Sequence, residues 1–147
     1  MANDDNARPR ATGGCLCGSV RFEVHGALRD VLICHCRFCQ RMHTHVGAYA
    51  ACAPSDLRII GGRTLRWYRS SPSARRGFCR KCGASLFWEP TPTTHISISA
   101  GSLDRPIGLK VVDHIFLAQK GDYYEVHFAK NDVPLLARDA QGGPPLP

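Results

Sequence analysis

The sequence lacks any apolar run long enough to cross a bilayer, and residues 1–12 contain no apolar segment of the kind found in secretion signals. Acidic residues are also few, with 12 Asp and Glu against 19 Lys and Arg. No shift in composition marks a second unit along the chain. From these absences we expect a soluble, cytoplasmic protein of one domain that has no membrane partner.

The length of 147 residues is sufficient for one domain with a hydrophobic core of its own. Residues 1–12 are polar and show no periodicity, so they are interpreted as a loose tail. The folded domain is expected over residues 13–130. Residues 131–147, which end in a run rich in glycine and proline, are expected to form a C-terminal extension.

Eight cysteines are many for a chain of this size. Without a secretion signal, such a density points to metal binding or catalysis more than to disulfides. The spacing agrees, because all but Cys52 are clustered as chelation requires. Cys52 itself lies in an apolar strand and is interpreted as a small core residue. The clustered cysteines are Cys15 and Cys17, Cys34, Cys36 and Cys39, and Cys79 and Cys82.

Three thiols converge within residues 34–39, where almost no loop has to be closed. Thiolates are soft ligands that select zinc or an iron–sulfur cluster over magnesium or calcium. Structural zinc sites have four protein ligands, whereas catalytic sites have three and keep an open position. The count of three therefore favours a catalytic site. The alternative is a closed structural site whose fourth ligand is Cys52, His43 or His45.

The two remaining cysteine pairs are expected to close one tetrahedral site together. Closing the long loop between them costs about 0.6 kcal/mol per doubling of length, whereas structural zinc contributes roughly 10–16 kcal/mol in small peptides. Each pair is followed by a glycine, Gly18 or Gly83, and then by an apolar strand, which suggests two similar turns with positive φ. An iron–sulfur cluster also takes four thiolates, but this repeated pattern favours zinc.

Short segments with alternating or continuous apolar residues, bounded by turn signals, predict an all-β fold of antiparallel strands with one short helix over residues 37–43. A further short element is expected over residues 123–128. The expected strands are residues 20–25, 31–34, 46–53, 57–60, 65–69, 86–88, 95–100 and 111–117.

Four motifs occur in order along the chain: Gly14-Cys15-x-Cys17-Gly18-x-Val20, Cys34-x-Cys36-x-x-Cys39, Tyr68-x-Ser70-Ser71-Pro72 and Phe78-Cys79-x-x-Cys82-Gly83. Together they resemble the glutathione-dependent formaldehyde-activating enzyme (GFA) family, which is similar to centromere protein V. The resemblance covers residues 13–128 and implies a β-tent fold with two zinc ions. The pairs Cys15/Cys17 and Cys79/Cys82 would hold a structural zinc, and the three cysteines of residues 34–39 a catalytic one.

The resemblance also implies a carbon–sulfur lyase that adds glutathione to formaldehyde, giving S-(hydroxymethyl)glutathione. A nearby histidine would move the proton, and His35, His43 and His45 are the candidates. Arg37 and Arg41 are candidates for binding a glutathione carboxylate. The alternative for each of these residues is an ordinary surface or structural role.

The formal net charge of +7 falls to roughly +4 once seven thiolates and two zinc ions are counted. This charge allows a second interpretation, a non-enzymatic zinc module that binds a protein or nucleic acid through a basic face. Nucleic acid is not the expected partner, and a homodimer is compatible with the sequence. The arginines outside the helix are interpreted as a solvated face: Arg21, Arg58, Arg63, Arg66, Arg69, Arg75 and Arg76.

Overall fold

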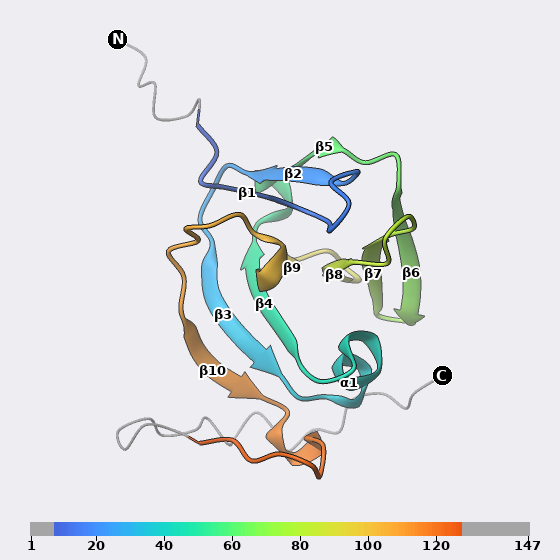
Figure 1. Ribbon diagram of the computed structural model, residues 1–147, viewed down its shortest axis with the longest axis vertical. Coiled ribbons are helices and arrows are strands. Elements are labelled where there is room, and N and C mark those ends of the chain that lie inside the picture. Colours follow the sequence, from blue (N-terminus) through green and yellow to red (C-terminus); the bar gives the residue numbers. More distant parts are fainter. Residues whose placement is uncertain (1–7, 128–147) are drawn as a thin grey trace.

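The computed structural model describes residues 8–127 as two β-sheets joined around a common core (Figure 1). The smaller sheet has the order β1-β2-β5, and the larger one β10-β3-β4-β9-β8-β7-β6. The smaller sheet consists of β1 (Ala11–Gly14), β2 (Arg21–Val24) and β5 (Leu57–Gly61). The larger sheet consists of β3 (Arg29–Cys34), β4 (Gly47–Cys52), β6 (Leu65–Ser71), β7 (Ala74–Cys79), β8 (Ser85–Pro90), β9 (Ile96–Ser99) and β10 (Val111–Ile115).

Helical structure in the described part of the chain is limited to α1 (Arg37–His43) and short 3-10 turns. No helix within residues 8–127 has both the length and the apolar character needed to span a membrane. The 3-10 turns are η2 (Pro54–Asp56), η3 (Ala100–Ser102) and η4 (Leu117–Gln119).

The predicted all-β fold with one short helix is confirmed, and the structure adds two strands that the sequence patterns did not indicate. The first is β1, which includes Ala11 and Thr12 and so begins within the expected tail. The second is β7, which pairs with both β6 and β8. All pairs are antiparallel as expected except β10 with β3, which is parallel. The expected extension over residues 131–147 lies outside the described residues, as do residues 1–7.

The hydrophobic core lies between the two sheets. Phe22 of β2 meets Phe87 of β8 edge to face, with ring centroids 5.1 Å apart. Both rings are almost fully buried, and Leu86 and Ile98 are completely so. Cys52 also packs into this core, at the end of β4. Burial of these apolar side chains holds the small sheet against the large one.

The segment β3-α1-β4 places three cysteines at one end of the larger sheet. Strand β3 ends at Cys34, and α1 begins three residues later, with Cys36 as its N-cap. The Cys36 side chain accepts a hydrogen bond from the Cys39 amide at 3.4 Å, which satisfies one of the free amides of the first turn. Helix α1 ends at His43 and is followed by the C-cap Thr44, whose φ is 61°, and β4 then returns antiparallel to β3.

Candidate metal centres and their cavity

The first candidate metal centre is formed by two turns of closely similar geometry. Gly18 and Gly83 have φ angles of 76° and 77°, and an added Cβ would meet no atom at either position, so the requirement is conformational. In each turn the glycine amide bonds to the carbonyl of the first cysteine, at 3.1 Å to Cys15 and 2.7 Å to Cys79. The expected repeat of two cysteine turns with positive φ is therefore confirmed.

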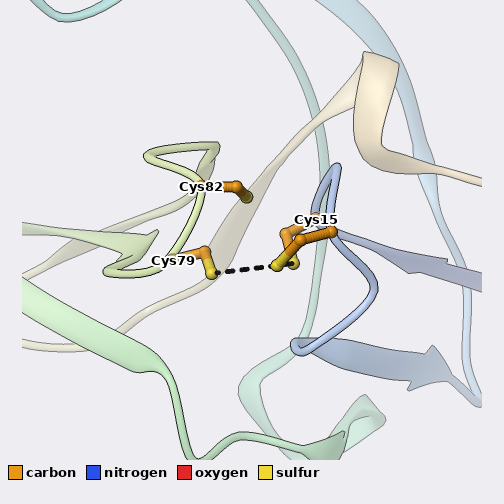
Figure 2. A group of neighbouring side chains, drawn as sticks. Cys15, Cys79 and Cys82 are labelled. Atoms are coloured by element: carbon orange, nitrogen blue, oxygen red, sulfur yellow. Dashed lines mark hydrogen bonds between the residues drawn. The ribbon is translucent and has the colours of Figure 1, made fainter.

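The two turns face each other, and Figure 2 shows the thiols of Cys79 and Cys82 pointing toward the turn of Cys15. The four sulfurs of this four-cysteine cluster, Cys15, Cys17, Cys79 and Cys82, all lie within 4.8 Å of one another. The Cys17 sulfur is 3.6 Å from that of Cys15 and 3.8 Å from that of Cys79. Tetrahedral zinc with bonds of about 2.3 Å to sulfur places its sulfurs about 3.8 Å apart. The cluster therefore has the donors and the spacing for a closed metal site compatible with zinc.

Neighbouring groups favour the thiolate at two of these positions. A hydrogen bond from the Thr64 hydroxyl, 3.3 Å from the Cys79 sulfur, lowers the pKa of Cys79 to about 6. Contact with the Ser19 hydroxyl at 3.2 Å lowers the pKa of Cys17. Metal ligands must be deprotonated, so these contacts help to prepare the cluster for a cation.

The second candidate centre is the three-cysteine cluster of Cys34, Cys36 and Cys39, whose sulfurs also lie within 4.8 Å of one another. Hydrogen bonding to the other two thiols lowers the pKa of Cys36, and it raises the pKa of Cys34. Among the described residues, no histidine or fourth cysteine joins this group. The donor set therefore suits a metal ion that keeps one position open.

The three-cysteine cluster lies in the wall of a cavity of about 340 Å³, and all three of its members line that cavity. None of the cysteines of the four-cysteine cluster does. Apolar side chains supply much of the wall, among them Phe38, Trp88 and Phe116. No Asp or Glu lines it within residues 8–127, whereas Arg29 and Arg76 do. The volume is in the range of small-molecule sites.

A chain of hydrogen bonds leads from this cavity to the end of α1. Arg76 donates through Nη1 to the Tyr49 hydroxyl at 3.3 Å, and His43 Nε2 lies 2.5 Å from that same hydroxyl. Arginine has no acceptor atom, so the tyrosine hydrogen is directed to Nε2. Burial and the Arg76 charge lower the pKa of His43, and burial raises the pKa of Tyr49. The resulting pair is a neutral imidazole that accepts a hydrogen bond from a protonated phenol.

The three candidate histidines occupy different environments. His43 contacts Tyr49, which lines the cavity. His35 is buried, with Nδ1 2.5 Å from the Tyr124 hydroxyl and Nε2 2.9 Å from His114 Nδ1. His45 is exposed and lies 2.6 Å from the Tyr123 hydroxyl. The His43 imidazole is connected to the cavity by its side-chain hydrogen bond to Tyr49.

The candidate arginines of α1 lie outside the cavity wall, and other polar residues lie in it. Arg37 and Arg41 are exposed on α1 and do not line the cavity. Tyr49, Ser70 and Arg76 do line it, and no pattern in the sequence assigned any of them to the site. The interpretation of Arg76 as part of a solvated face is wrong, because its side chain is buried. The strand that carries it, β7, lies between two others, and that position depends on long-range pairing.

The comparisons with known proteins agree with this arrangement. Residues 10–119 match the family model described as glutathione-dependent formaldehyde-activating enzyme. A crystal structure of a Rhodobacter sphaeroides protein, solved as a structural genomics target, is 28% identical in sequence with a TM-score of 0.55. The match covers 68% of this chain and 97% of the Rhodobacter chain. The family model spans most of the chain, including both cysteine clusters. This chain therefore belongs to the family of glutathione-dependent formaldehyde-activating enzymes.

Proposed function

We propose that this chain is a zinc-dependent carbon–sulfur lyase that adds a thiol such as glutathione to a small aldehyde such as formaldehyde, and that it catalyses the reverse reaction. The observation that carries the proposal is the difference between the two clusters. One is a closed set of four thiols away from the cavity, and the other is a set of three thiols in its wall. Family membership supports a glutathione-dependent, aldehyde-activating role.

The proposal assigns one zinc ion to each cluster. The four-cysteine cluster would hold a structural ion that ties two distant turns together. Cys34, Cys36 and Cys39 would hold the other ion, which when bound supplies Lewis-acid stabilisation to a sulfur anion at its open position. All eight cysteines are free thiols, and a reducing cytoplasm is the compartment in which they stay available to metal.

The reaction forms a carbon–sulfur bond and moves one proton. The thiol loses its proton, the sulfur attacks the carbonyl carbon, and the carbonyl oxygen takes the electron pair and then a proton. Tyr49 is placed to relay that proton, because its hydroxyl faces His43 and its side chain lines the cavity. His43 accepts the proton through Tyr49 and returns it by the same route to the alkoxide. The positive charge of Arg76 beside a protonated His43 favours that return.

The apolar wall of the cavity contributes by excluding water from the reacting groups. Phe38, Trp88 and Phe116 give the site a low local polarity, which strengthens the interaction of a sulfur anion with nearby positive charge. The site thus combines a place for the thiol, a proton relay and a dry surface for the aldehyde.

The proposal is tested by exchange NMR of formaldehyde with glutathione. Zinc-loaded protein is expected to accelerate exchange between free formaldehyde and the hydroxymethyl adduct, and Cys36→Ala is expected to lose the acceleration. Cys52→Ala, a change in the core at the one cysteine that belongs to neither cluster, is the matched control and should retain it. Exchange at the spontaneous rate with glutathione and several other thiols and aldehydes would refute the lyase proposal and leave the non-enzymatic zinc module.

A further inference from the structure

Arg76 is a buried cation in an unusual setting. Its side chain is only 4% exposed and lies on β7, within the larger sheet. Neighbouring Arg75 faces elsewhere, where it pairs with Glu89 at 2.7 Å and covers the Trp67 ring. No carboxylate pairs with Arg76 among the residues that the structure describes. An unpaired buried charge is costly, so the Arg76 charge has to be balanced within the cavity, by the thiolates of the three-cysteine cluster, by a bound anion or by both.

The contacts of the guanidinium leave part of it available. Arg76 Nε donates to the Ser70 hydroxyl at 3.2 Å, and Nη1 donates to the Tyr49 hydroxyl at 3.3 Å. A guanidinium has five N–H groups, so these two bonds leave three without a partner within residues 8–127. The group is held in place by two neutral oxygens and lines the cavity.

The groups around Arg76 determine which sign of charge on a ligand the cavity favours. Arg76 and Cys39 line the same cavity, so the guanidinium shares this space with the three-cysteine cluster. The cavity wall also contains Arg29 and, within the described residues, no acidic side chain. A cationic ligand would therefore meet two like charges, and an anionic ligand would find unused N–H donors next to the three-cysteine cluster.

From this arrangement we infer that Arg76 is the anion-binding residue of the cavity and makes it select thiols that carry negative charge over neutral and cationic thiols of the same size. Ser70 acts as a positioning residue, because its hydroxyl fixes Nε. The inference rests on the proposed function in one respect, since it takes a thiol as the ligand. It adds to that function the residue that discriminates among thiols, Arg76, and the property by which it does so, the charge of the thiol.

The test is calorimetric titration of the zinc-loaded protein, without aldehyde, with three small thiols that differ in charge. The probes are 3-mercaptopropionate, its neutral amide and the cationic 2-aminoethanethiol. Charge-assisted hydrogen bonds exceed neutral ones enough to give the wild-type protein about a tenfold or greater preference for the carboxylate over the amide. The cationic thiol is expected to bind most weakly.

Arg76→Met should bring the affinities of the carboxylate and the amide close together, and Arg76→Lys should keep most of the preference. Arg75→Met is the matched control on the same strand and should leave the preference unchanged. If Arg76→Met does not fold, Ser70→Ala, which loosens the guanidinium, is expected to reduce the preference severalfold. Equal affinities of the wild-type protein for all three thiols would overturn the inference, as would an undiminished preference in Arg76→Met.

The outcomes separate this inference from the proposed function. Charge-selective thiol binding without acceleration of aldehyde exchange would support the role of Arg76 and refute the lyase. Acceleration with equal affinities for the three thiols would support the lyase and refute the role of Arg76. Absence of binding by all three thiols would refute the inference.

Discussion

Removal of one thiol from each cluster should destabilise the protein to different extents. Cys82→Ala removes a thiol from the four-cysteine cluster, and Cys36→Ala removes one from the three-cysteine cluster. Both side chains are half-buried and both changes delete one sulfur, so the loss of local contacts is similar. The difference in stability then reflects what each metal ion ties together.

The size of that difference follows from the chain topology. Cys17 and Cys79 are 62 positions apart, whereas the three-cysteine cluster spans residues 34–39. If each metal is treated as a cross-link, it raises the free energy of the unfolded chain by reducing its entropy. This contribution to stability is about 4 kcal/mol for a loop of about 60 residues and about 2 kcal/mol for a loop of about five residues. Cys82→Ala should therefore cost about 2 kcal/mol more than Cys36→Ala. For a domain of this size, the gap corresponds to about 4–8 °C in Tm.

The assay is differential scanning calorimetry of the zinc-loaded variants, with zinc content measured on the same samples. Wild-type protein is expected to carry about two zinc ions per chain and each variant about one. The fold should survive in Cys36→Ala and be strongly destabilised in Cys82→Ala. Equal losses of Tm, or a larger loss in Cys36→Ala, would refute the division into a structural and an open site.

Three further changes test separate parts of the account. Tyr49→Phe keeps the buried ring and removes the proton relay, so the rate of exchange between formaldehyde and the adduct, measured by NMR, should fall by about 10²-fold or more. Tyr68→Phe, on the exposed face of β6, is the control and should show the wild-type rate. Gly47→Ala would place a Cβ 2.5 Å from the Tyr49 ring and 3.0 Å from the Cys39 sulfur. It should therefore lower the free energy of unfolding, measured with denaturant, by about 1–3 kcal/mol and weaken zinc retention at the three-cysteine cluster. Unchanged stability and zinc content would show that the site is packed more loosely than described. Phe22→Ala should cost about 3–5 kcal/mol by the same measurement, and a loss below about 1 kcal/mol would contradict its place in the core.

The two cysteine clusters could be predicted from the sequence because their ligands are close together along the chain or lie in repeated turns. A spacing such as that of residues 34–39 permits convergence with almost no loop to close. The glycines that follow each pair indicated the positive φ that both turns have. The short helix after Cys36 was also predictable, since it begins and ends within one local segment.

The cavity could not be predicted in the same way, because its polar residues come from strands that are distant in sequence. Tyr49 lies in the apolar run of β4, where a tyrosine is expected simply to pack. Arg75 and Arg76 are neighbours in β7, and successive side chains of a strand point to opposite faces. The sequence therefore indicates that one of the two arginines points inward, but it does not indicate which one. That choice depends on the pairing of β7 with β6 and β8, which no local pattern specifies.

The parallel pairing of β10 with β3 was missed for a related reason. Both segments read as apolar strands, and their mutual direction is set by the path of the chain between them. This pairing brings Ile115 beside Cys34, and Ile115 and Phe116 into the cavity wall. The apolar character of the cavity is thus a product of topology, whereas its thiols are a product of local sequence.

The central claim is that one cluster binds its metal with four thiolates and the other leaves a position for a thiol from solution. X-ray absorption at the zinc edge tests it most directly, by counting sulfur neighbours before and after 3-mercaptopropionate is added to the zinc-loaded protein. The account predicts about 3.5 sulfurs per zinc with a light-atom neighbour at first, and about four sulfurs afterwards. Four sulfurs per zinc at the outset, or a light-atom neighbour that the thiol does not displace, would contradict it.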